Sequence, residues 1–506
     1  MMRAGVIGAG PAGLALALRL QAAGVATTVV EALAHPGGGL AAQVDLPGIG
    51  RVDAHPAPLA DPAGWRELWA LAPPDPAGAE PATGIRPLPV DPLRRLNWPD
   101  ATQMDWTADP AALARDVARL APGDLAGFEE FLALSRRLVA SRRLPRRVPA
   151  RRTEPSRLAA LVHALPDWFG AHGWQSLDAR AAGLVRSGKL RQALAHQPLL
   201  AGRNPLTTPA MAAGALADEL DRGLWWPEGG LAPLLARLAA RFTALGGELR
   251  LADPATAVLT LGNRATGVAC ASGWQAHFDC VASTADPMHT AHTLLAGTEA
   301  GSRMTRRLRR RRWTPALFTV HFALAGAWPG IAHDTLLFAQ RWEDLLGDID
   351  QRGLLPTDMI IRLLHPTVTD PTLAPAGHSL FTAQVPVAHL GLLPLDWETT
   401  GPLMQRRVLD EIGRRLIPDI YDRVLAATHR TPRDHALDYN AWLGSAAGPE
   451  PSRLSQVSPE SAVPPGPIAN LWQFGAGEGA GGSFLATASA TANRIVAAHS
   501  EGASAR

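Results

Sequence analysis

The residues best suited to chemistry stand at the start of the chain, where Gly8-Ala9-Gly10-Pro11-Ala12-Gly13 forms a GxGxxG pattern. Gly8 permits a tight turn, Gly10 lets the backbone approach a pyrophosphate, and Gly13 allows the next helix to pack closely. Glu31 follows, and a carboxylate at this spacing can accept hydrogen bonds from both hydroxyls of a ribose. The pattern therefore predicts a dinucleotide site at the N-terminus of a helix.

Two further glycine clusters favour FAD over NAD as the dinucleotide. Pro36-Gly37-Gly38-Gly39 comes soon after Glu31, where NAD-binding domains rarely carry a second cluster. Near the other end of the chain, Gly475-Ala476-Gly477-Glu478 follows a short apolar run and forms another turn of the nucleotide-binding type. The predicted cofactor-binding residues are Gly8, Ala9, Gly10, Pro11, Ala12, Gly13, Glu31, Gly38, Gly39, Gly475, Gly477 and Glu478.

The elements that would position these residues are visible in the apolar pattern. Residues 4–7 and 26–30 read as buried strands on either side of an apolar helix over residues 14–23, which is half of a doubly wound sheet. The stretch from 110 to 220 has helical spacing, and 61–100 reads as loops with short helices. Further expected elements are a helix over 231–245, strands over 248–251 and 280–282, a hairpin around Gly262-Asn263, a strand over 470–474 and a helix over 486–498.

Composition excludes several classes of protein. A chain of 506 residues is too long for one hydrophobic core, so two or three packed units are expected. The two cysteines, Cys270 and Cys280, can form neither a disulfide framework nor a usual metal site, and they fit a reducing cytoplasm. The first long apolar run, over residues 4–18, is shorter than the ~20 residues that a membrane-spanning helix needs and lacks the features of a signal peptide.

Several blocks along nearly the whole chain resemble the bacterial-type phytoene desaturase family of FAD-dependent carotenoid enzymes. Asn204-Pro205-Leu206-Thr207-Thr208 is similar to an Asn-Pro-Phe-Thr-Thr element of that family, and Ala282-Ser283-Thr284-Ala285-Asp286 to its Ala-Ser-Asn-Ala-Asp element. Further blocks that carry the resemblance are 6–16, 226–230, 245–248, 365–371, 374–377, 386–391, 395–397 and 440–446. Amine oxidases share the flavin fold but lack these blocks, so an amine or porphyrinogen oxidase is a minor alternative.

The resemblance implies an α/β fold. It has a doubly wound, glutathione-reductase-like FAD-binding domain, a discontinuous α+β substrate domain and a helical membrane-facing region. We expect the FAD-binding domain to be assembled from residues 1–95, 216–295 and 465–506. Residues 96–215 would form the helical entry region and 296–464 the substrate-binding domain. The implied activity is FAD-dependent desaturation of a long polyene hydrocarbon of the phytoene type.

Three features depart from the family pattern, all on the expected cofactor side. Gly39 stands where the family has the arginine of Pro-Gly-Gly-Arg. Asp53-Ala54-His55-Pro56 places an imidazole where Asp-Ala-Gly-Pro is usual. The loop after Gly477 is about three residues shorter than in the family. These departures leave two alternatives open: a non-redox carrier of isoprenoids or carotenoids on the same scaffold, and a flavin-dependent carotenoid isomerase.

Desaturation of a hydrocarbon removes a hydride from an allylic carbon and a proton from its neighbour. No side chain accepts a hydride, so the flavin must do so, while the protein orients the substrate and excludes water. A substrate without polar groups should occupy a long apolar tunnel. No catalytic base is assigned. His55, Asp286 and His389 are ionisable groups in suitable blocks, but a structural hydrogen-bonding role explains each at least as well.

The basic residues suggest a partner as well as a substrate. Four arginine pairs lie between Arg136 and Arg152, and a second cluster runs from Arg306 to Arg312. Basic helices attract anionic lipid headgroups, which favours peripheral association with the inner face of the membrane of a cytoplasmic enzyme. A solvated basic surface is an equally good explanation. Nucleic acid is not expected as a partner, because no RNA-binding motif accompanies the clusters. The electron acceptor would be a quinone or oxygen.

Overall fold

The computed structural model describes residues 1–72, 86–143, 166–450, 468–475 and 484–504. Its first layer is a five-stranded parallel sheet in the order β10-β2-β1-β14-β20. The strands are Glu248–Arg250, Ala26–Val30, Arg3–Ile7, Cys280–Ser283 and Leu471–Gln473. Strands from both ends of the chain thus pair with β14 from its middle, and the expected doubly wound sheet is confirmed.

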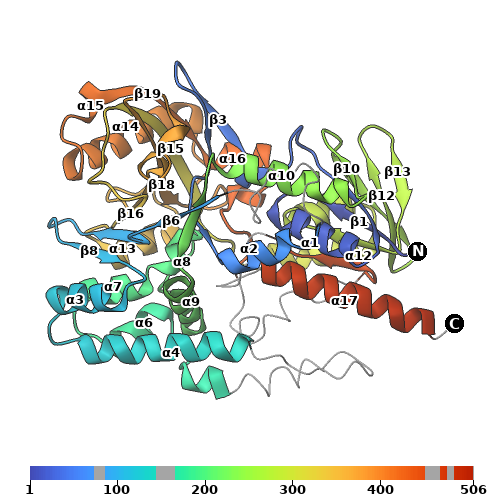
Figure 1. Ribbon diagram of the computed structural model, residues 1–506, viewed down its shortest axis with the longest axis horizontal. Helices are drawn as coiled ribbons and strands as arrows, with labels where there is room; N and C mark the ends of the chain where they lie inside the picture. The colour runs from blue at the N-terminus through green and yellow to red at the C-terminus, as the bar shows by residue number, and fades with distance from the viewer. Residues whose placement is uncertain (73–85, 144–165, 451–467, 476–483, 505–506) are drawn as a thin grey trace.

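Helices and a second small sheet cover the parallel sheet. Helices α10 (Leu231–Ala244) and α17 (Phe484–Ser504) both pack against α1 (Pro11–Ala22), and both chain ends lie on this side of the molecule (Figure 1). Helix α1 begins at Pro11, three residues earlier than predicted, because proline suits the first turn, where its missing N–H is not needed. β11 (Ala255–Leu261), β12 (Arg264–Cys270) and β13 (Gln275–His277) form a small antiparallel sheet. It packs against the parallel sheet through Val258 and Val268.

A seven-stranded sheet in the order β19-β15-β18-β17-β16-β7-β8 forms the second half of the molecule. Its strands are Val424–Arg430, Ala316–Ala325, His378–Val387, Ile361–Leu364, Asp334–Leu337, Arg94–Asn97 and Gln103–Trp106. Phe318, Val320 and Phe322 of β15 belong to the core that also holds residues of α14 (Trp397–Arg415) and α15 (Ile420–Arg423). Since successive side chains of a strand alternate, the other face of β15 carries Thr319, His321 and Ala323.

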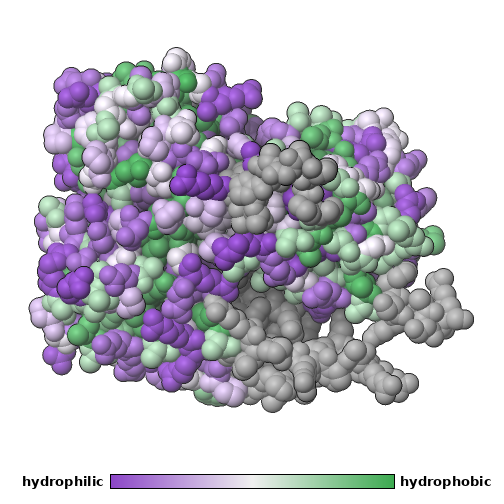
Figure 2. Space-filling model, viewed as in Figure 1, coloured by the Kyte–Doolittle hydropathy of each residue, from purple (hydrophilic) through white to green (hydrophobic). Residues whose placement is uncertain are grey.

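The described residues between 110 and 222 are mainly helical, as expected, and lie beneath the seven-stranded sheet (Figure 1). Its helices are α3 (Pro110–Leu120), α4 (Leu125–Arg143), α6 (Leu177–Ala182), α7 (Gly188–Ala195), α8 (Gln197–Leu200) and α9 (Gly214–Arg222). No helix in the described part of the chain is long and apolar enough to cross a membrane. Hydrophilic and hydrophobic side chains are intermixed over the face seen in Figure 2.

Short elements complete the fold. The strands are β3 (Gln43–Leu46), β4 (Gly50–Asp53), β5 (Leu59–Ala60), β6 (Pro87–Val90) and β9 (Leu224–Pro227), and the helices are α2 (Pro62–Trp69), α11 (Pro287–His289), α12 (Glu299–Arg309), α13 (Trp342–Gly347) and α16 (Pro432–Asp438). The expected domain boundaries at 95, 215, 295 and 464 stay predictions. Strand β7, which spans the first of them, pairs with β16 of the later segment, and β8 pairs with β7.

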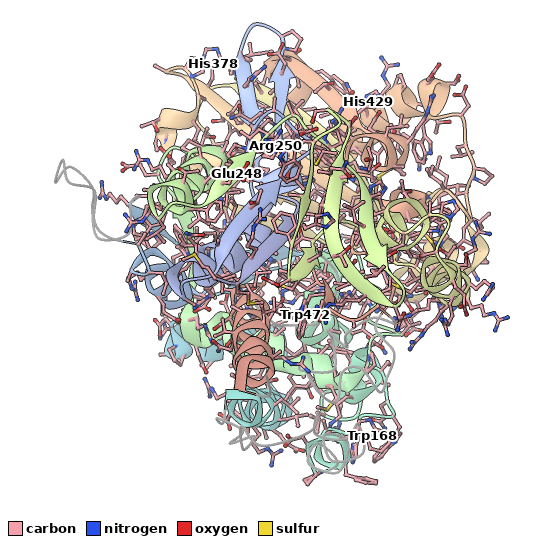
Figure 3. All side chains as sticks on the ribbon, turned by 90° about the vertical axis from the view of Figure 1, so that its right-hand side faces the viewer. Trp168, Glu248, Arg250, His378, His429 and Trp472 are labelled. Carbon is pink, nitrogen blue, oxygen red and sulfur yellow. The ribbon has the colours of Figure 1, made fainter. Side chains whose placement is uncertain are left out.

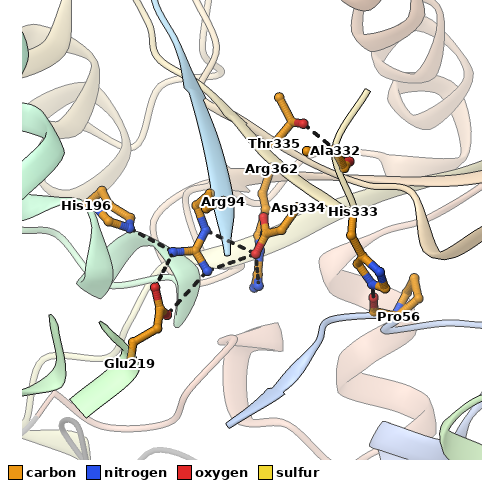
Figure 4. Close-up of polar contacts among 9 residues, drawn as sticks. All are labelled: Pro56, Arg94, His196, Glu219, Ala332, His333, Asp334, Thr335 and Arg362. Carbon is orange, nitrogen blue, oxygen red and sulfur yellow. Dashed lines mark hydrogen bonds and ion pairs between the residues drawn. The ribbon is translucent and has the colours of Figure 1, made fainter. Parts of the chain in front are cut away.

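A buried ionic network joins the helical region to the seven-stranded sheet (Figure 4). The Arg94 guanidinium on β7 lies 2.9 Å from the Asp334 carboxylate on β16 and 3.0 Å from Glu219 on α9. Arg362 on β17 donates to the same Asp334 carboxylate at 2.7 Å, and Arg94 also contacts His196 Nε2 at 2.8 Å. The two guanidinium groups hold the pKa of Asp334 well below its usual range despite its burial.

Candidate functional site

The first glycine turn has the shape that a pyrophosphate requires. Gly8 has a φ of +99°, in the left-handed region that favours glycine, and its N–H donates to Val30 O at 2.8 Å. A Cβ on Gly13 would lie only 2.0 Å from Gly8 O, so a larger residue would force α1 away from the turn. A Cβ on Gly10 would meet nothing within 4 Å, which leaves open space at the N-terminus of the helix. The turn therefore fits the phosphates of a dinucleotide. Ala9, Pro11 and Ala12 complete it.

Glu31 stands directly beside this turn, at the end of β2. Its side chain is buried and accepts the N–H groups of Ala9 at 2.7 Å and Leu33 at 3.0 Å. A carboxylate has about four lone-pair positions, so two remain for other donors. These backbone bonds fix its orientation, and the group is placed to accept hydrogen bonds from the hydroxyls of a ribose.

The second glycine cluster folds back over the first turn. Gly37 has a φ of +106°, and a Cβ on Gly38, whose φ is +55°, would lie 3.2 Å from the Cα of Gly10. Gly39 is different, because its φ is not positive and a Cβ there would stand 3.6 Å from the Tyr439 ring, an ordinary contact. The close approach of the two loops thus explains Gly38, and the positive φ with the contact to Ala41 explains Gly37, but neither explains Gly39.

The C-terminal turn reaches the same end of the parallel sheet. Gly475 follows β20 with a φ of +152°, and a Cβ on it would lie 2.9 Å from Thr284 O, just after β14. Gly477 and Glu478 lie outside the described residues. The described members of the predicted set therefore gather around one end of the sheet, and this arrangement fits FAD. Their roles in binding stay predictions.

A cavity of about 250 Å³ lies where the nucleotide-binding unit meets the seven-stranded sheet. Asp53 and Gly229 line it from the first side, and Leu380, Phe381 and Thr382 of β18 from the second. Its remaining lining residues are Gln43, Arg51, Val52, Pro56, Trp226, Pro366, Thr372 and Leu373. The lining is partly apolar and partly polar, so this cavity is not the wholly apolar tunnel expected from the sequence.

His55 lies between the two units rather than in the open. Gln384 on β18 donates to its Nδ1 at 3.4 Å, and its ring meets the His435 ring edge-on with centroids 5.9 Å apart. Burial, followed by the charges of His435 and Arg430, lowers the pKa of His55 to about 3. The imidazole is therefore neutral at physiological pH.

The other two candidates have local structural roles. Asp286 caps α11 by accepting the N–H of Met288 at 2.7 Å, and it accepts the N–H of Trp442 at 3.3 Å. Burial raises its pKa. His389 accepts the N–H of Gly391 at 3.1 Å, and burial lowers its pKa. These contacts account for both groups without a catalytic function.

Sequence reasoning missed His321 and His435, which lie close to His55. His321 is buried on the polar face of β15, and its pKa, lowered mainly by burial and then by His55, is about 3. A histidine two residues after Thr319 in a mostly apolar ten-residue strand was the available signal. In the part of the chain that the structure describes, no group of three or more His, Cys, Asp or Glu side chains could hold a metal ion.

Comparison with known proteins gives a consistent result. Residues 6–71 match the family model of NAD(P)-binding Rossmann-like domains, and residues 85–429 match that of flavin containing amine oxidoreductases. The chain is 36% identical to a lycopene-forming phytoene desaturase of Paracoccus sp., with 88% of this chain and 87% of the relative covered. It is 33% identical to a lycopene-forming phytoene desaturase of Pseudescherichia vulneris, with 98% and 99% covered. A neurosporene-forming enzyme of Cereibacter sphaeroides is 32% identical, with 94% and 90% covered.

Solved structures show the same fold at lower identity. Putrescine oxidase in its wild-type form bound to putrescine superimposes with a TM-score of 0.62 and 14% identity, with 98% of this chain and 99% of that one covered. An oxidoreductase from Methanosarcina mazei gives a TM-score of 0.60 at 16% identity, with 96% and 99% covered. These likenesses concern the fold alone.

Proposed function

Because this chain belongs to the phytoene desaturase family of flavin-dependent oxidoreductases, we propose that its substrate is phytoene or a closely related carotenoid. The chain is an FAD-dependent carotenoid desaturase. The observation that carries this assignment is the 36% identity to a phytoene desaturase over 88% of the chain. The retained Gly8, Gly10, Gly13 and Glu31 agree with it, because a carrier would not need a carboxylate for a ribose. The carrier and isomerase alternatives are not favoured.

The chemistry divides between the cofactor and the chain. Bound oxidised flavin supplies the hydride acceptor that no side chain can provide. The residues of the glycine turn would hold its pyrophosphate, and Glu31 its adenosine ribose. The cavity between the two units would hold the reacting part of the polyene and keep water from it. Holding the polyene in the reactive orientation would account for much of the rate of desaturation.

The decisive assay combines the protein, FAD, phytoene-loaded liposomes and an acceptor. Successive desaturations lengthen the conjugated system, so absorption bands should move into the visible range. Running the assay with a quinone under nitrogen, and with oxygen alone, separates the two acceptors that we propose. If flavin binds but no longer chromophore forms with either acceptor, the desaturase assignment is wrong.

We further propose that the enzyme is cytoplasmic and binds the inner face of the membrane. Arg136 and Arg137 are exposed on α4, within the helical region 96–215 that we expected to face the membrane. The pairs at 146–147 and 151–152 lie outside the described residues. An aromatic cluster adds a second argument, since Phe169 is 57% and Trp174 44% exposed, and both rings contact Trp168 at the edge of the molecule (Figure 3). Exposed aromatic side chains and exposed basic side chains both suit the headgroup region of a bilayer.

Liposome sedimentation tests this proposal. Binding should grow with anionic lipid and fall with salt, because attraction to headgroups is screened over ~8 Å at physiological ionic strength. The double variant Phe169→Ser/Trp174→Ser should weaken binding. Leu437→Ser, which removes another side chain that is 67% exposed, is the matched control and should bind like the wild type. Equal binding of all three proteins would contradict an aromatic anchor.

A further inference from the structure

One face of the seven-stranded sheet is polar where a hydrocarbon enzyme would be expected to be apolar. Thr382 and Gln384 of β18 pair with His321 and Thr319 of β15, and paired residues of antiparallel strands point to the same face. Arg430 of β19 pairs with Thr319, and Arg362 of β17 pairs with Gln384. The sheet therefore carries on this face the residues Thr319, His321, Arg362, Thr382, Gln384 and Arg430.

Three histidines meet at this face, and we call them the histidine cluster: His55, His321 and His435. His321 is 1% exposed and its Nδ1 lies 3.0 Å from Thr382 Oγ1. His55 is reached by Gln384 from the sheet, and His435, which is 8% exposed, meets His55 edge-on. Among the described residues, neither the Nε2 atoms of His55 and His321 nor the ring nitrogens of His435 have a hydrogen-bond partner. These nitrogens are not fully enclosed, so a ligand or a transferred proton can reach them.

The surroundings keep these imidazoles neutral. Burial is the largest influence on all three pKa values and lowers each of them. Arg430 lowers the pKa of all three rings, His435 lowers that of His55 and His321, and His55 lowers that of His321. Arg362 also lowers the pKa of His55. Asp434 and Asp438 act weakly in the opposite direction on His435. A neutral imidazole has one nitrogen with a free lone pair, which is what a proton acceptor needs.

We propose that His321 accepts the proton that the carotenoid loses during desaturation, and that His55 and His435 carry it toward solvent. The inference rests on the proposed function. The hydride leaves one carbon with its electron pair for the oxidised flavin, and the neighbouring C–H bond breaks to give the new C=C bond. Its proton forms an N–H bond at His321 Nε2, which is free to accept when Nδ1–H donates to Thr382 Oγ1.

The position of the cluster supports this role. Thr382, which holds His321, and Pro56, which follows His55, both line the cavity between the two units. The carbon next to a developing allylic cation is a strong acid, so even an imidazole of low pKa can accept its proton. A chain of imidazoles gives that proton a route out of a cavity from which the polyene excludes water.

Asp53 is the competing base, because its carboxylate also lines the cavity. It is already engaged, since Asp53 Oδ2 accepts the N–H of Leu231 at 2.8 Å at the start of α10. Burial raises the pKa of Asp53, but the helix N-terminus favours the anion and protonation would weaken that contact. His321 Nε2 has no such hydrogen bond among the described residues.

The test is single-turnover reduction of the FAD-loaded enzyme by phytoene in liposomes without oxygen, followed as loss of flavin absorbance. His321→Ala should slow this bleaching by about 100-fold or more, the scale of a lost general base. FAD affinity and the change that phytoene binding causes in the flavin spectrum should stay within about threefold of wild type. Added imidazole should restore the rate of His321→Ala in proportion to its free-base concentration. A structural defect would not respond in this way.

Two variants serve as comparisons. His429→Ala removes another histidine of the same sheet, whose Nδ1 lies 2.7 Å from Gln405 Oε1 and whose ring stacks on Phe318, so its bleaching rate should stay near wild type without imidazole rescue. His435→Phe should slow steady-state turnover more than it slows the first reduction of the flavin. The reason is that the proton must leave the site before the next catalytic cycle. Unaltered bleaching in His321→Ala, a loss that imidazole does not rescue, or an equal loss in Asp53→Asn with normal FAD binding would overturn the proposal. No bleaching in the wild type would refute the proposed function and this inference with it.

Discussion

At the scale of single residues, Glu31 offers the most direct test of the nucleotide site. Its carboxylate is oriented by two backbone N–H groups and keeps lone pairs for a ribose. Glu31→Ala should weaken FAD binding by ~1–3 kcal/mol, the value of charge-assisted hydrogen bonds. Flavin fluorescence titration measures the change. Glu248→Ala on the neighbouring strand β10 (Figure 3), whose carboxylate bonds Thr28, is the control and should bind FAD normally. Equal affinity of both variants would remove Glu31 from the site.

At Gly39, by contrast, a substitution should strengthen FAD binding. The space beside it accepts a side chain without strain, since a Cβ would stand 3.6 Å from Tyr439. Gly39→Arg should therefore fold normally and tighten FAD binding by ~0.5–1 kcal/mol through attraction to the phosphates. Gly38→Arg is the matched comparison and should weaken binding, because the φ of +55° and the 3.2 Å approach to Gly10 leave no room. Looser binding in Gly39→Arg than in wild type would contradict the placement of this residue near the cofactor.

At the scale of elements, the apolar periodicity of the sequence predicted those helices and strands whose ends are set by nearby residues. The helix expected over 231–245 is found as Leu231–Ala244, since its apolar spacing and the following glycines mark both ends. The stretch 61–100 was predicted as loops with short helices, and this was wrong for Pro87–Val90 and Arg94–Asn97, which are strands β6 and β7. Two adjacent arginines do not look like a buried strand. Arg94 is nevertheless 1% exposed, because Asp334 and Glu219 from distant segments neutralise it, and no local pattern reveals such partners.

The ionic network at β7 therefore predicts a large effect from a single change. Asp334→Ala should lower the free energy of unfolding by ~3–5 kcal/mol, because it leaves Arg94 and Arg362 buried with one carboxylate fewer. Asp105→Ala on the adjacent strand β8 removes the partner of Arg95 in a partly exposed pair and should cost less than ~1 kcal/mol. Thermal melting of the two variants measures the difference. Similar melting temperatures would show that the network does not stabilise the junction.

At the scale of the whole molecule, the candidate site depends on contacts between distant segments. The glycine turn, Glu31 and the C-terminal strand could be predicted because each has a local signature, and parallel pairing then brings them to one end of a sheet. The histidine cluster could not, because His55, His321 and His435 come from three segments that only the packing of two units brings together. Strand alternation would have placed His321 on a polar face, but not opposite His55.

The buried histidines also predict how the stability of the whole molecule depends on pH. Burial lowers the pKa of His196 and His321 to about 3 and of His333 and His365 to about 4, whereas in the unfolded chain each returns to its ordinary value near 6.5. Below pH 6.5 the unfolded chain binds protons that the folded protein excludes. The free energy of unfolding should therefore be highest above pH 6.5 and should fall as the pH drops toward 4.

Each of these histidines removes up to ~1.4 kcal/mol of stability per pH unit within that window. Asp334, whose folded pKa is depressed, loses its own contribution only below the ordinary aspartate value of 3.8, so the histidines dominate the window. Melting temperatures at pH 7.5, 6.5 and 5.5 should fall with increasing steepness. His365→Gln, which removes one titrating group, should be less stable at pH 7.5 but show a shallower fall. A melting temperature that stays constant down to pH 5.5 would mean that the buried imidazoles take up protons in the folded protein.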